Sequence, residues 1–239
     1  MKEEVSLSVI VPFYNEENYL KDSIQRLIKE ESFSSIIMVN DASTDYSLNI
    51  ANSLLNIDNR LQLISLEQNN GKGNAIKEAL KLVNTSHVIV HDADLEYYPK
   101  DITRMFNLLL KHQNNLIIGS RTLNKKNVQN RYLITYLGNK YLTKLFCLVN
   151  NCNISDIASC YWLINTEILK SMQISEKGFG IEVEVISKYI SKHGNILEIP
   201  IDYSGRTYSE GKKIKISDGL NIFIKIIKFS KLINHRNYY

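Results

Sequence analysis

The 239-residue chain has little cysteine, little proline and no long uncharged apolar run. An odd set of three cysteines, Cys147, Cys152 and Cys160, without the usual zinc-ligand spacings, favours reduced thiols in a cytosolic setting. Because no stretch holds eighteen uncharged apolar residues, we expect no membrane-spanning helix. The segment before Pro12 is too short and too acidic for a signal peptide.

Charge excludes a second group of functions. The net charge of +4 is too small to indicate a nucleic-acid partner, and no basic run alternates with stacking aromatic residues. A mildly basic surface suits anionic small molecules or the negatively charged cytoplasmic leaflet of a membrane. With 44% hydrophobic and 23% charged residues, the chain has the composition of one large globular domain.

Short apolar runs alternate with amphipathic stretches, which predicts buried strands separated by helices. Strands are expected at residues 7–11, 36–40, 61–66, 88–91, 116–119, 161–164 and 196–201. Helices are expected at residues 19–29, 47–55, 75–83, 102–111, 129–149 and 181–192, with a last one from about Ser217. This pattern indicates an α/β fold with a Rossmann-like, mostly parallel sheet that gathers ligands at its strand ends. Since no linker or repeat interrupts the chain, we expect a single domain over residues 1–213. Residues 214–239 would add an amphipathic helix that is part of the domain or packed on it.

The loop after the first strand contains Pro12 and Asn15 but no Gly-x-Gly-x-x-Gly turn, which argues against a dehydrogenase. We expect Pro12 to stiffen the strand exit and Asn15 to cap the next helix. After the second strand, the Asp41 carboxylate can accept the ring N–H of a uracil or guanine. Capping is the alternative in this turn; with the motifs below, we favour base recognition for Asp41 and capping for Asp45.

Residues 69–74 place two glycines around Lys72 before a helix. Such glycines allow backbone N–H groups to approach an anion, and Lys72 adds positive charge. The spacing differs from that of a Walker loop. A flexible loop with a solvated lysine is the alternative interpretation.

Asp92-Ala93-Asp94 directly follows a buried strand and is the strongest signal in the chain. Two unneutralised carboxylates would repel a sugar diphosphate, since each close charge pair is worth roughly 4 kcal/mol at a protein surface. Mg²⁺ or Mn²⁺ on hard oxygen ligands would remove this repulsion and neutralise a departing diphosphate. A turn aspartate and a helix cap would explain one of these carboxylates better than both.

Taken together, these motifs occur in the order seen in family 2 glycosyltransferases. The chain resembles the branch that contains dolichol-phosphate mannose synthase and bacterial polyprenyl-phosphate glycosyltransferases. The motifs that carry the resemblance lie at residues 12–16, 40–45, 71–73, 92–94, 119–121, 137–140, 179–184 and 205–213.

The resemblance implies a GT-A fold and inverting transfer from a UDP- or GDP-sugar to a dolichyl or undecaprenyl phosphate. It implies several groups of site residues. The base and ribose would be held by Pro12, Tyr14, Glu16 and Asp41. The nucleotide would also contact Lys72 and Asp92. The metal ion, Mg²⁺ or Mn²⁺, and the diphosphate would be bound by Asp92 and Asp94. Arg121 and Arg131 would face donor or acceptor phosphate, and Arg206 and Lys212 would lie in a loop able to close over the phosphates. Solvated surface cations are the alternative for Arg206 and Lys212.

The acceptor stays open at this point, because residues 156–162 depart from the pattern of the relatives, notably at Trp162. A lipid phosphate is already anionic and needs no strong base, whereas a saccharide hydroxyl needs a carboxylate to take its proton. Asp156 and Glu182 are the candidates. Glu184 lies two residues from Glu182 on an expected helix, so only one of the two should enter the site. A sugar-nucleotide-binding partner without catalysis is a third interpretation.

The last apolar segment, residues 220–233, carries Lys225, Lys228 and Lys231 at three-residue spacing. An amphipathic helix of this kind could lie in a membrane interface. A helix packed on the domain with a solvated lysine edge is the alternative. We therefore expect a cytoplasmic protein, with peripheral attachment to the cytoplasmic face of the membrane as the open question.

Overall fold

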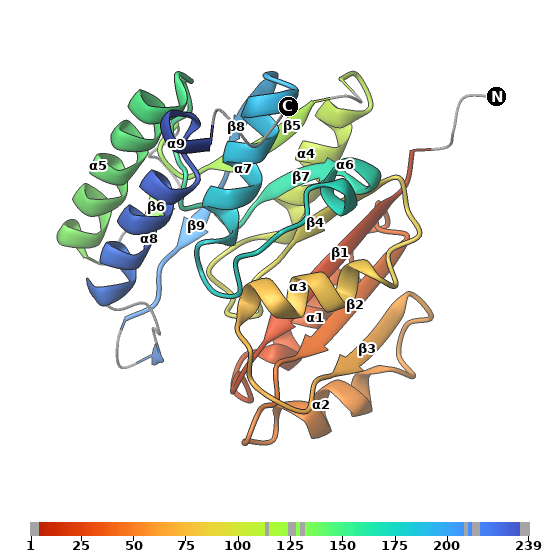
Figure 1. Cartoon of the computed structure of the whole chain (residues 1–239). Helices are drawn as coiled ribbons and strands as arrows, with labels where there is room; N and C mark the ends of the chain where they lie inside the picture. The colour runs from red at the N-terminus through yellow and green to blue at the C-terminus, as the bar shows by residue number, and fades with distance from the viewer. Residues whose placement is uncertain are drawn as a thin grey trace.

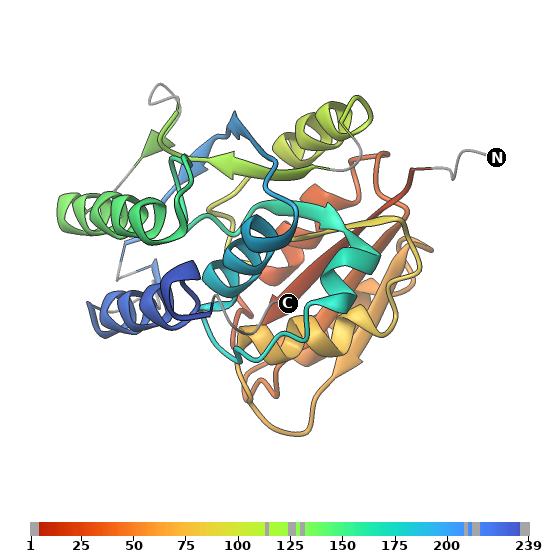
Figure 2. The same cartoon turned by 45° about the horizontal axis from the view of Figure 1, so that its top comes forward.

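A central sheet organises the chain, as Figures 1 and 2 show. The computed structural model describes residues 5–112, 115–123, 128–129, 132–207, 210–211 and 216–234. Its seven-stranded sheet comprises β1 (Leu7–Phe13), β2 (Ser35–Asn40), β3 (Leu61–Ser65), β4 (His87–Val90), β5 (Leu116–Ser120), β7 (Trp162–Asn165) and β8 (Ile196–Pro200). The order is β3-β2-β1-β4-β7-β5-β8, and only β7 runs antiparallel to its neighbours. The prediction of a Rossmann-like, mostly parallel sheet in a single domain is confirmed.

Helices cover both faces of this sheet, because alternate side chains of a strand point to opposite sides. In β1, Ile10 packs in one core while Val9 and Val11 pack in the other. The second core joins the sheet to α1 (Leu20–Leu27), α2 (Ser47–Leu54) and α4 (Pro99–Leu109). The first core joins it to α3 (Lys72–Leu80), α5 (Leu133–Asn150), α6 (Thr166–Ser171), α7 (Ile181–Lys192) and α8 (Ile216–Lys228).

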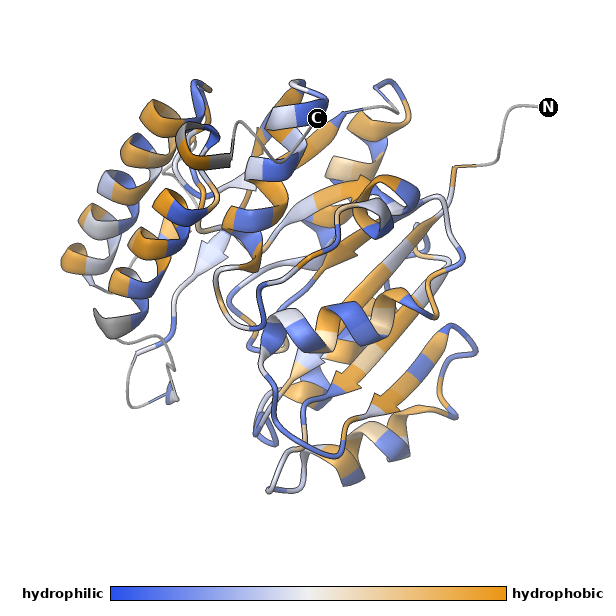
Figure 3. Ribbon diagram, viewed as in Figure 1, coloured by the Kyte–Doolittle hydropathy of each residue, from blue (hydrophilic) through white to orange (hydrophobic). Residues whose placement is uncertain are grey.

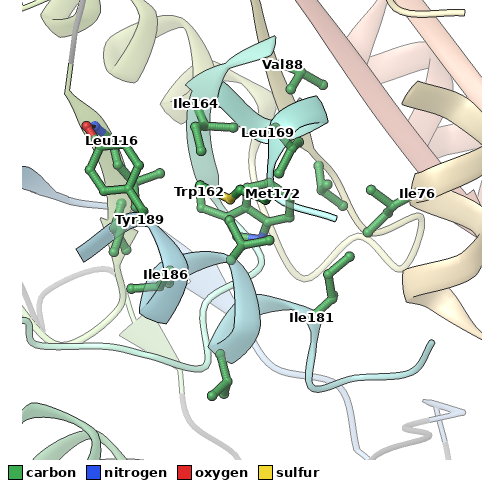
Figure 4. Close-up of a cluster of buried hydrophobic side chains, with 14 of the residues drawn as sticks. Ile76, Val88, Leu116, Trp162, Ile164, Leu169, Met172, Ile181, Ile186 and Tyr189 are labelled. Atoms are coloured by element: carbon green, nitrogen blue, oxygen red, sulfur yellow. Dashed lines mark hydrogen bonds between the residues drawn. The ribbon is translucent and has the colours of Figure 1, made fainter. Parts of the chain in front are cut away.

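Trp162 lies in the first core and is fully buried. Figure 4 shows its ring among Ile164, Leu169 and Met172, with α7 on the other side. The tryptophan that departs from the family pattern therefore contributes to packing and does not face the cavity described below. Figure 3 shows apolar residues concentrated on the strands of the central sheet.

Several predicted boundaries differ from the structure, two of them next to the site. The helix expected at residues 129–149 begins at Leu133, because Val128–Gln129 instead forms β6, which pairs with β9 (Tyr203–Ser204). The helix expected from residue 75 begins at Lys72, so the glycine motif belongs to its first turn. The short elements α6, β6, β9 and α9 (Lys231–Asn234) were not predicted, since so few residues carry no periodic pattern.

The C-terminal helix α8 packs beside α5 and against α7 (Figures 1 and 2). The expected lysine stripe does not form a solvated edge. Lys225 pairs with Glu176 at 2.6 Å and Lys231 is half-buried, so only Lys228 is exposed. Among the described residues, no helix combines the length and the apolar composition needed to cross a bilayer.

Candidate active site

The carboxyl ends of β1, β2, β4 and β5 meet at one edge of the sheet around a cavity of about 340 Å³. Ten of the predicted site residues line it: Pro12, Tyr14, Glu16, Asp41, Lys72, Asp92, Asp94, Arg121, Glu182 and Arg206. Asp156 does not line the cavity but pairs with Arg121, which does. Arg131 and Lys212 lie outside the described residues. The opposite wall consists of Thr135 and Asn139 of α5, Asp218 and Ile222 of α8, and Tyr132, which directly precedes α5.

The first two loops hold each other in place. Asn15 adopts a left-handed conformation with φ 50° and donates its backbone N–H to Ser43 Oγ at 3.0 Å. Its side-chain oxygen accepts from the Thr44 N–H at 2.8 Å, so Asn15 joins two loops and does not cap α1 as predicted. Asp45 accepts the Ser47 N–H at 2.9 Å and the Glu17 N–H at 3.1 Å; because the N-cap of α2 is Tyr46, Asp45 lies just before the cap position, not at it as predicted, and joins the same two loops.

Asp41 joins the second loop to the start of α3. Its two carboxylate oxygens accept the N–H groups of Asn70 and Gly71 at 3.0 and 2.8 Å. The carboxyl group still lines the cavity, although the residue is only 4% exposed. Each carboxylate oxygen has a second lone pair, so Asp41 can accept a further hydrogen bond from a ligand.

The glycines of residues 71–73 have a different role from the predicted one. Gly73 donates its N–H to the Lys177 carbonyl at 2.7 Å, so that group is not available to an anion. A Cβ on Gly71 would lie 2.6 Å from Lys177 O, and one on Gly73 would lie 2.5 Å from Glu176 O. These glycines therefore allow the segment before α7 to pack against α3, which positions Lys72.

Lys72 reaches into the cavity and joins two acidic residues. Its Nζ lies 2.8 Å from Asp92 Oδ1 and 2.9 Å from Glu182 Oε1. Burial opposes the charged form, but the charges of Asp92 and Glu182 outweigh burial and raise the pKa of Lys72 well above its ordinary value. Burial also opposes ionisation of Asp92, but the charge and hydrogen bond of Lys72 keep the Asp92 pKa low.

Asp94 lies in a second cluster, around Arg206. Arg206 Nη2 is 3.3 Å from Asp94 Oδ2, Nη1 is 3.2 Å from Glu16 Oε2, and the guanidinium stacks over Tyr19 at 5.0 Å. Among the described residues, its buried Nε has no hydrogen-bond partner. Burial, followed by the charges of Glu96 and Asp92, raises the pKa of Asp94 to about 8. This cluster holds more negative charge than Arg206 neutralises.

Glu96 is a member of this cluster that the sequence analysis missed. It accepts hydrogen bonds from the Tyr203 hydroxyl and, at 2.8 Å, from the Arg206 N–H. Its spacing continues the series 92, 94, 96, which is the signal that could have revealed it. Tyr203 comes from β9, an element with no sequence signal.

Arg121 forms the third charged group, with Asp156. Its Nε and Nη2 each donate to one Asp156 oxygen at 2.8 Å, and its backbone N–H adds a bond of 3.1 Å. The guanidinium also lies over the rings of Tyr203 and Tyr97 at 5.0 and 6.0 Å. Burial disfavours the charge, but Asp156 and Tyr97 outweigh it and raise the pKa of Arg121.

Glu182 and Glu184 point in different directions, as expected for residues two apart on a helix. Glu182 lines the cavity, whereas Glu184 is fully buried and accepts the N–H groups of Ser175 and Glu176. Lys188 pairs with Glu184 at 2.6 Å. Of these two glutamates, only Glu182 can therefore contact a ligand in the cavity.

A family model, curated relatives and solved structures all relate this chain to glycosyltransferases. The family model described as "Glycosyl transferase family 2" matches residues 8–172. The UDP-N-acetylglucosamine–dolichyl-phosphate N-acetylglucosaminyltransferase of Methanococcus voltae is 26% identical over 246 residues, covering 95% of this chain and 97% of that protein. The dolichol-phosphate mannosyltransferase of Pyrococcus furiosus is 24% identical over 212 residues, covering 87% of this chain and 59% of that protein. The structure of glucosyl-3-phosphoglycerate synthase from Mycobacterium tuberculosis with Mn²⁺, UDP and phosphoglyceric acid has a TM-score of 0.74 at 16% identity, covering 94% of this chain and 78% of that one. At that identity the likeness shows a shared fold.

Proposed function

Because the chain belongs to glycosyl transferase family 2 and is a glycosyltransferase with the GT-A fold, we propose that it moves one sugar from a UDP- or GDP-sugar to a polyprenyl phosphate. The family resemblance supports an inverting course for this transfer. The observation that carries the choice of acceptor is that both candidate general bases, Asp156 and Glu182, are held in ion pairs within the site.

The donor nucleotide fits the part of the cavity between β1 and β2. Pro12, Tyr14 and Glu16 come from the first loop, and the remaining lone pairs of Asp41 can accept a ring N–H of the base. Lys72 and Arg206 supply positive charge between this region and the opposite wall, which suits two phosphates. Arg121 adds a third cation for donor or acceptor phosphate.

A divalent metal fits the acidic side of the cavity. Among the described residues no three His, Cys, Asp or Glu side chains are grouped to hold a metal by themselves. Mg²⁺, however, is commonly bound by one or two carboxylates together with substrate phosphates. Asp92 and Asp94 offer hard oxygen ligands. Burial and the charges of Glu96 and Asp92 disfavour ionised Asp94, and a bound cation would offset both effects. Such a metal would neutralise the leaving diphosphate.

The ion pairs favour an acceptor that brings its own negative charge. A saccharide hydroxyl would need Asp156 or Glu182 to take a proton, which would cost Arg121 or Lys72 its charged partner. A phosphate nucleophile needs no such step. The two relatives named above are a dolichyl-phosphate and a dolichol-phosphate transferase, which supports the same choice. Since polyprenyl phosphates lie in membranes, the proposal includes a cytoplasmic protein in peripheral contact with the membrane's cytoplasmic face.

The acceptor prediction can be tested with radiolabelled UDP- and GDP-sugars. With Mn²⁺ present, we expect label to pass to a short-chain polyprenyl phosphate and to become extractable into organic solvent. The matched control is the corresponding polyprenol, which lacks the phosphate and should receive no label. Transfer to saccharides alone would replace the proposed acceptor with a hydroxyl. Nucleotide binding without turnover on any acceptor would indicate a non-catalytic binding protein.

A further inference from the structure

Two of the three cysteines lie together at the end of α5. Cys147 is in the last turn of the helix, and Cys152 lies just beyond it. Asn151 adopts the left-handed conformation with φ 50°, and the Cys152 N–H donates to the Cys147 carbonyl at 3.1 Å. This is the Schellman arrangement of a helix end, in which these two positions commonly make a side-chain contact. The backbone therefore places the two thiols next to each other.

The two thiols are in contact, and the third cysteine is separate from them. Cys147 and Cys152 share a hydrogen bond, and both are half-buried against the first core. Cys160 is buried in the second core, on the other face of the sheet. A disulfide requires side chains that face each other, so that the sulfur atoms can approach to about 2 Å. Cys147 and Cys152 already face each other, whereas the sheet separates Cys160 from both.

Cys147 is the stronger nucleophile of the pair. Its Sγ accepts hydrogen bonds from the Cys152 thiol and, at 3.4 Å, from the Ile154 N–H. These bonds outweigh burial and the charge of Glu198, and they lower the pKa of Cys147 to about 6. The hydrogen bond that Cys152 donates, together with burial, raises the pKa of Cys152, although the charge of Lys231 on α9 acts in the opposite direction. At neutral pH the pair therefore carries its negative charge on Cys147.

We propose that Cys147 and Cys152 form a reversible modification site, at which a low-molecular-weight disulfide such as oxidised glutathione converts the two thiols into one intramolecular disulfide. The Cys147 thiolate attacks one sulfur of oxidised glutathione, which forms a mixed disulfide and releases one glutathione. The Cys152 sulfur then attacks Cys147 Sγ, which forms the intramolecular bond and releases the second glutathione. The two thiol protons of the protein pass to the two released glutathiones, so one disulfide is reduced for each one formed. In a reducing cytosol such a bond is transient.

The pair is connected to the active site through the segment that follows it. Cys147 Sγ accepts the Ile154 N–H and, as a thiol, donates to the Ile154 carbonyl at 3.3 Å. Asp156, two residues further on, pairs with Arg121 of the cavity lining. Disulfide formation removes the thiol proton and draws Cys147 Sγ toward Cys152, so Ile154 loses these hydrogen bonds. We therefore expect oxidation to loosen the segment that holds Asp156.

Mass spectrometry of the whole chain tests the proposal without any substrate. After incubation with oxidised glutathione at neutral pH, the wild type should lose the mass of two hydrogen atoms and keep only Cys160 open to alkylation after unfolding. Cys152→Ser should stop at the mixed disulfide and retain one glutathione on Cys147. Cys147→Ser should react at least about tenfold more slowly, because it lacks the stabilised thiolate. The matched control, Cys160→Ser, should form the disulfide as the wild type does.

The pH dependence of the initial rate identifies the attacking thiol. Because the thiolate is the reactive form, the rate should rise through about pH 6 and level off near about pH 7. An ordinary cysteine, with a pKa of about 8.5, would still gain rate above that range.

Amide hydrogen exchange tests the connection to the active site. The exchange rate at Ile154 should rise at least about tenfold in the oxidised chain and return to its first value after reduction with dithiothreitol. Unchanged exchange in a chain that carries the disulfide would contradict this connection.

Four results would overturn the modification site itself. They are two thiols of the pair still open to alkylation, a wild type that retains glutathione, a disulfide-linked dimer, or equal rates for the wild type and Cys147→Ser. None of these measurements uses a sugar nucleotide or an acceptor. Their outcome is therefore independent of the proposed function.

Discussion

Replacing Asp94 by asparagine is expected to lower kcat/KM for sugar transfer by at least about a hundredfold, since the site would lose a charge aimed at the metal and diphosphate. The same change should not lower the thermal unfolding midpoint. Burial and the charges of Glu96 and Asp92 raise the pKa of Asp94 to about 8, well above its unfolded value, so folding at pH 7 must either protonate Asp94 or bury its charge, and both cost free energy. The neutral amide removes that cost.

Initial-rate kinetics over a range of Mn²⁺ concentrations, together with thermal unfolding at pH 7, measure both effects. Glu167→Gln is a matched control, because that side chain is 82% exposed on α6 and lies away from the cavity. The control should keep wild-type kinetics. An Asp94→Asn variant with unchanged kcat/KM and unchanged Mn²⁺ dependence would remove Asp94 from the metal site.

Arg121→Met is expected to destabilise the fold by about 3–5 kcal/mol, because it leaves the Asp156 carboxylate buried without its partner. Asp156 has a side-chain exposure of 2% and Arg121 one of 11%, so solvent cannot replace the lost interaction. For a chain of this size the melting temperature should fall by roughly 10 °C. Transfer activity should also fall, since Arg121 lines the cavity.

The double variant Arg121→Met/Asp156→Leu separates stability from activity. Removing both charges should recover much of the lost stability, because no uncompensated carboxylate remains. Activity should stay low. The surface pair of Lys81 and Glu78 gives a control: Lys81→Met should change stability by less than about 1 kcal/mol. Equal losses in both single variants would mean that the buried pair contributes no more than a solvated one.

The sequence allowed the fold class and most of the cavity lining to be predicted, because both follow from local patterns. Buried strands have continuous apolar runs, and the residues just after them must lie at one sheet edge. Asp41 and Asp92 were found in this way. Glu16 and Tyr14 came from the family resemblance, and the structure brings them to the same edge.

The features that the sequence did not predict depend on contacts between residues far apart in the chain. Lys72 and Glu182 are 110 residues apart in the sequence, and Arg121 and Asp156 are 35 residues apart. The periodicity of apolar residues therefore cannot predict these ion pairs. The sequence left the glycines beside Lys72 as an anion site or a flexible loop, because a local pattern cannot show the packing of residues 176–178 against α3. The same limit applies to β6 and β9, two-residue strands that form only because they meet in space.

These long-range pairs change the functional interpretation. From the sequence, Asp156 and Glu182 were candidate bases for a hydroxyl acceptor. In the fold each is bound to a buried cation, and the cavity retains three positive groups, Lys72, Arg121 and Arg206. Neither carboxylate can take a proton without depriving its cation of a charged partner, which favours an acceptor that is already anionic; a bound metal ion would offset the acidic residues of the lining.

A crystal structure with UDP or GDP and Mn²⁺ tests the central claim most directly, because anomalous scattering locates manganese independently of the protein. We predict one manganese peak in coordination contact with Asp94 and with the diphosphate, and the base beside Asp41. A nucleotide bound elsewhere, or a diphosphate held with Asp92 and Asp94 turned away, would contradict it.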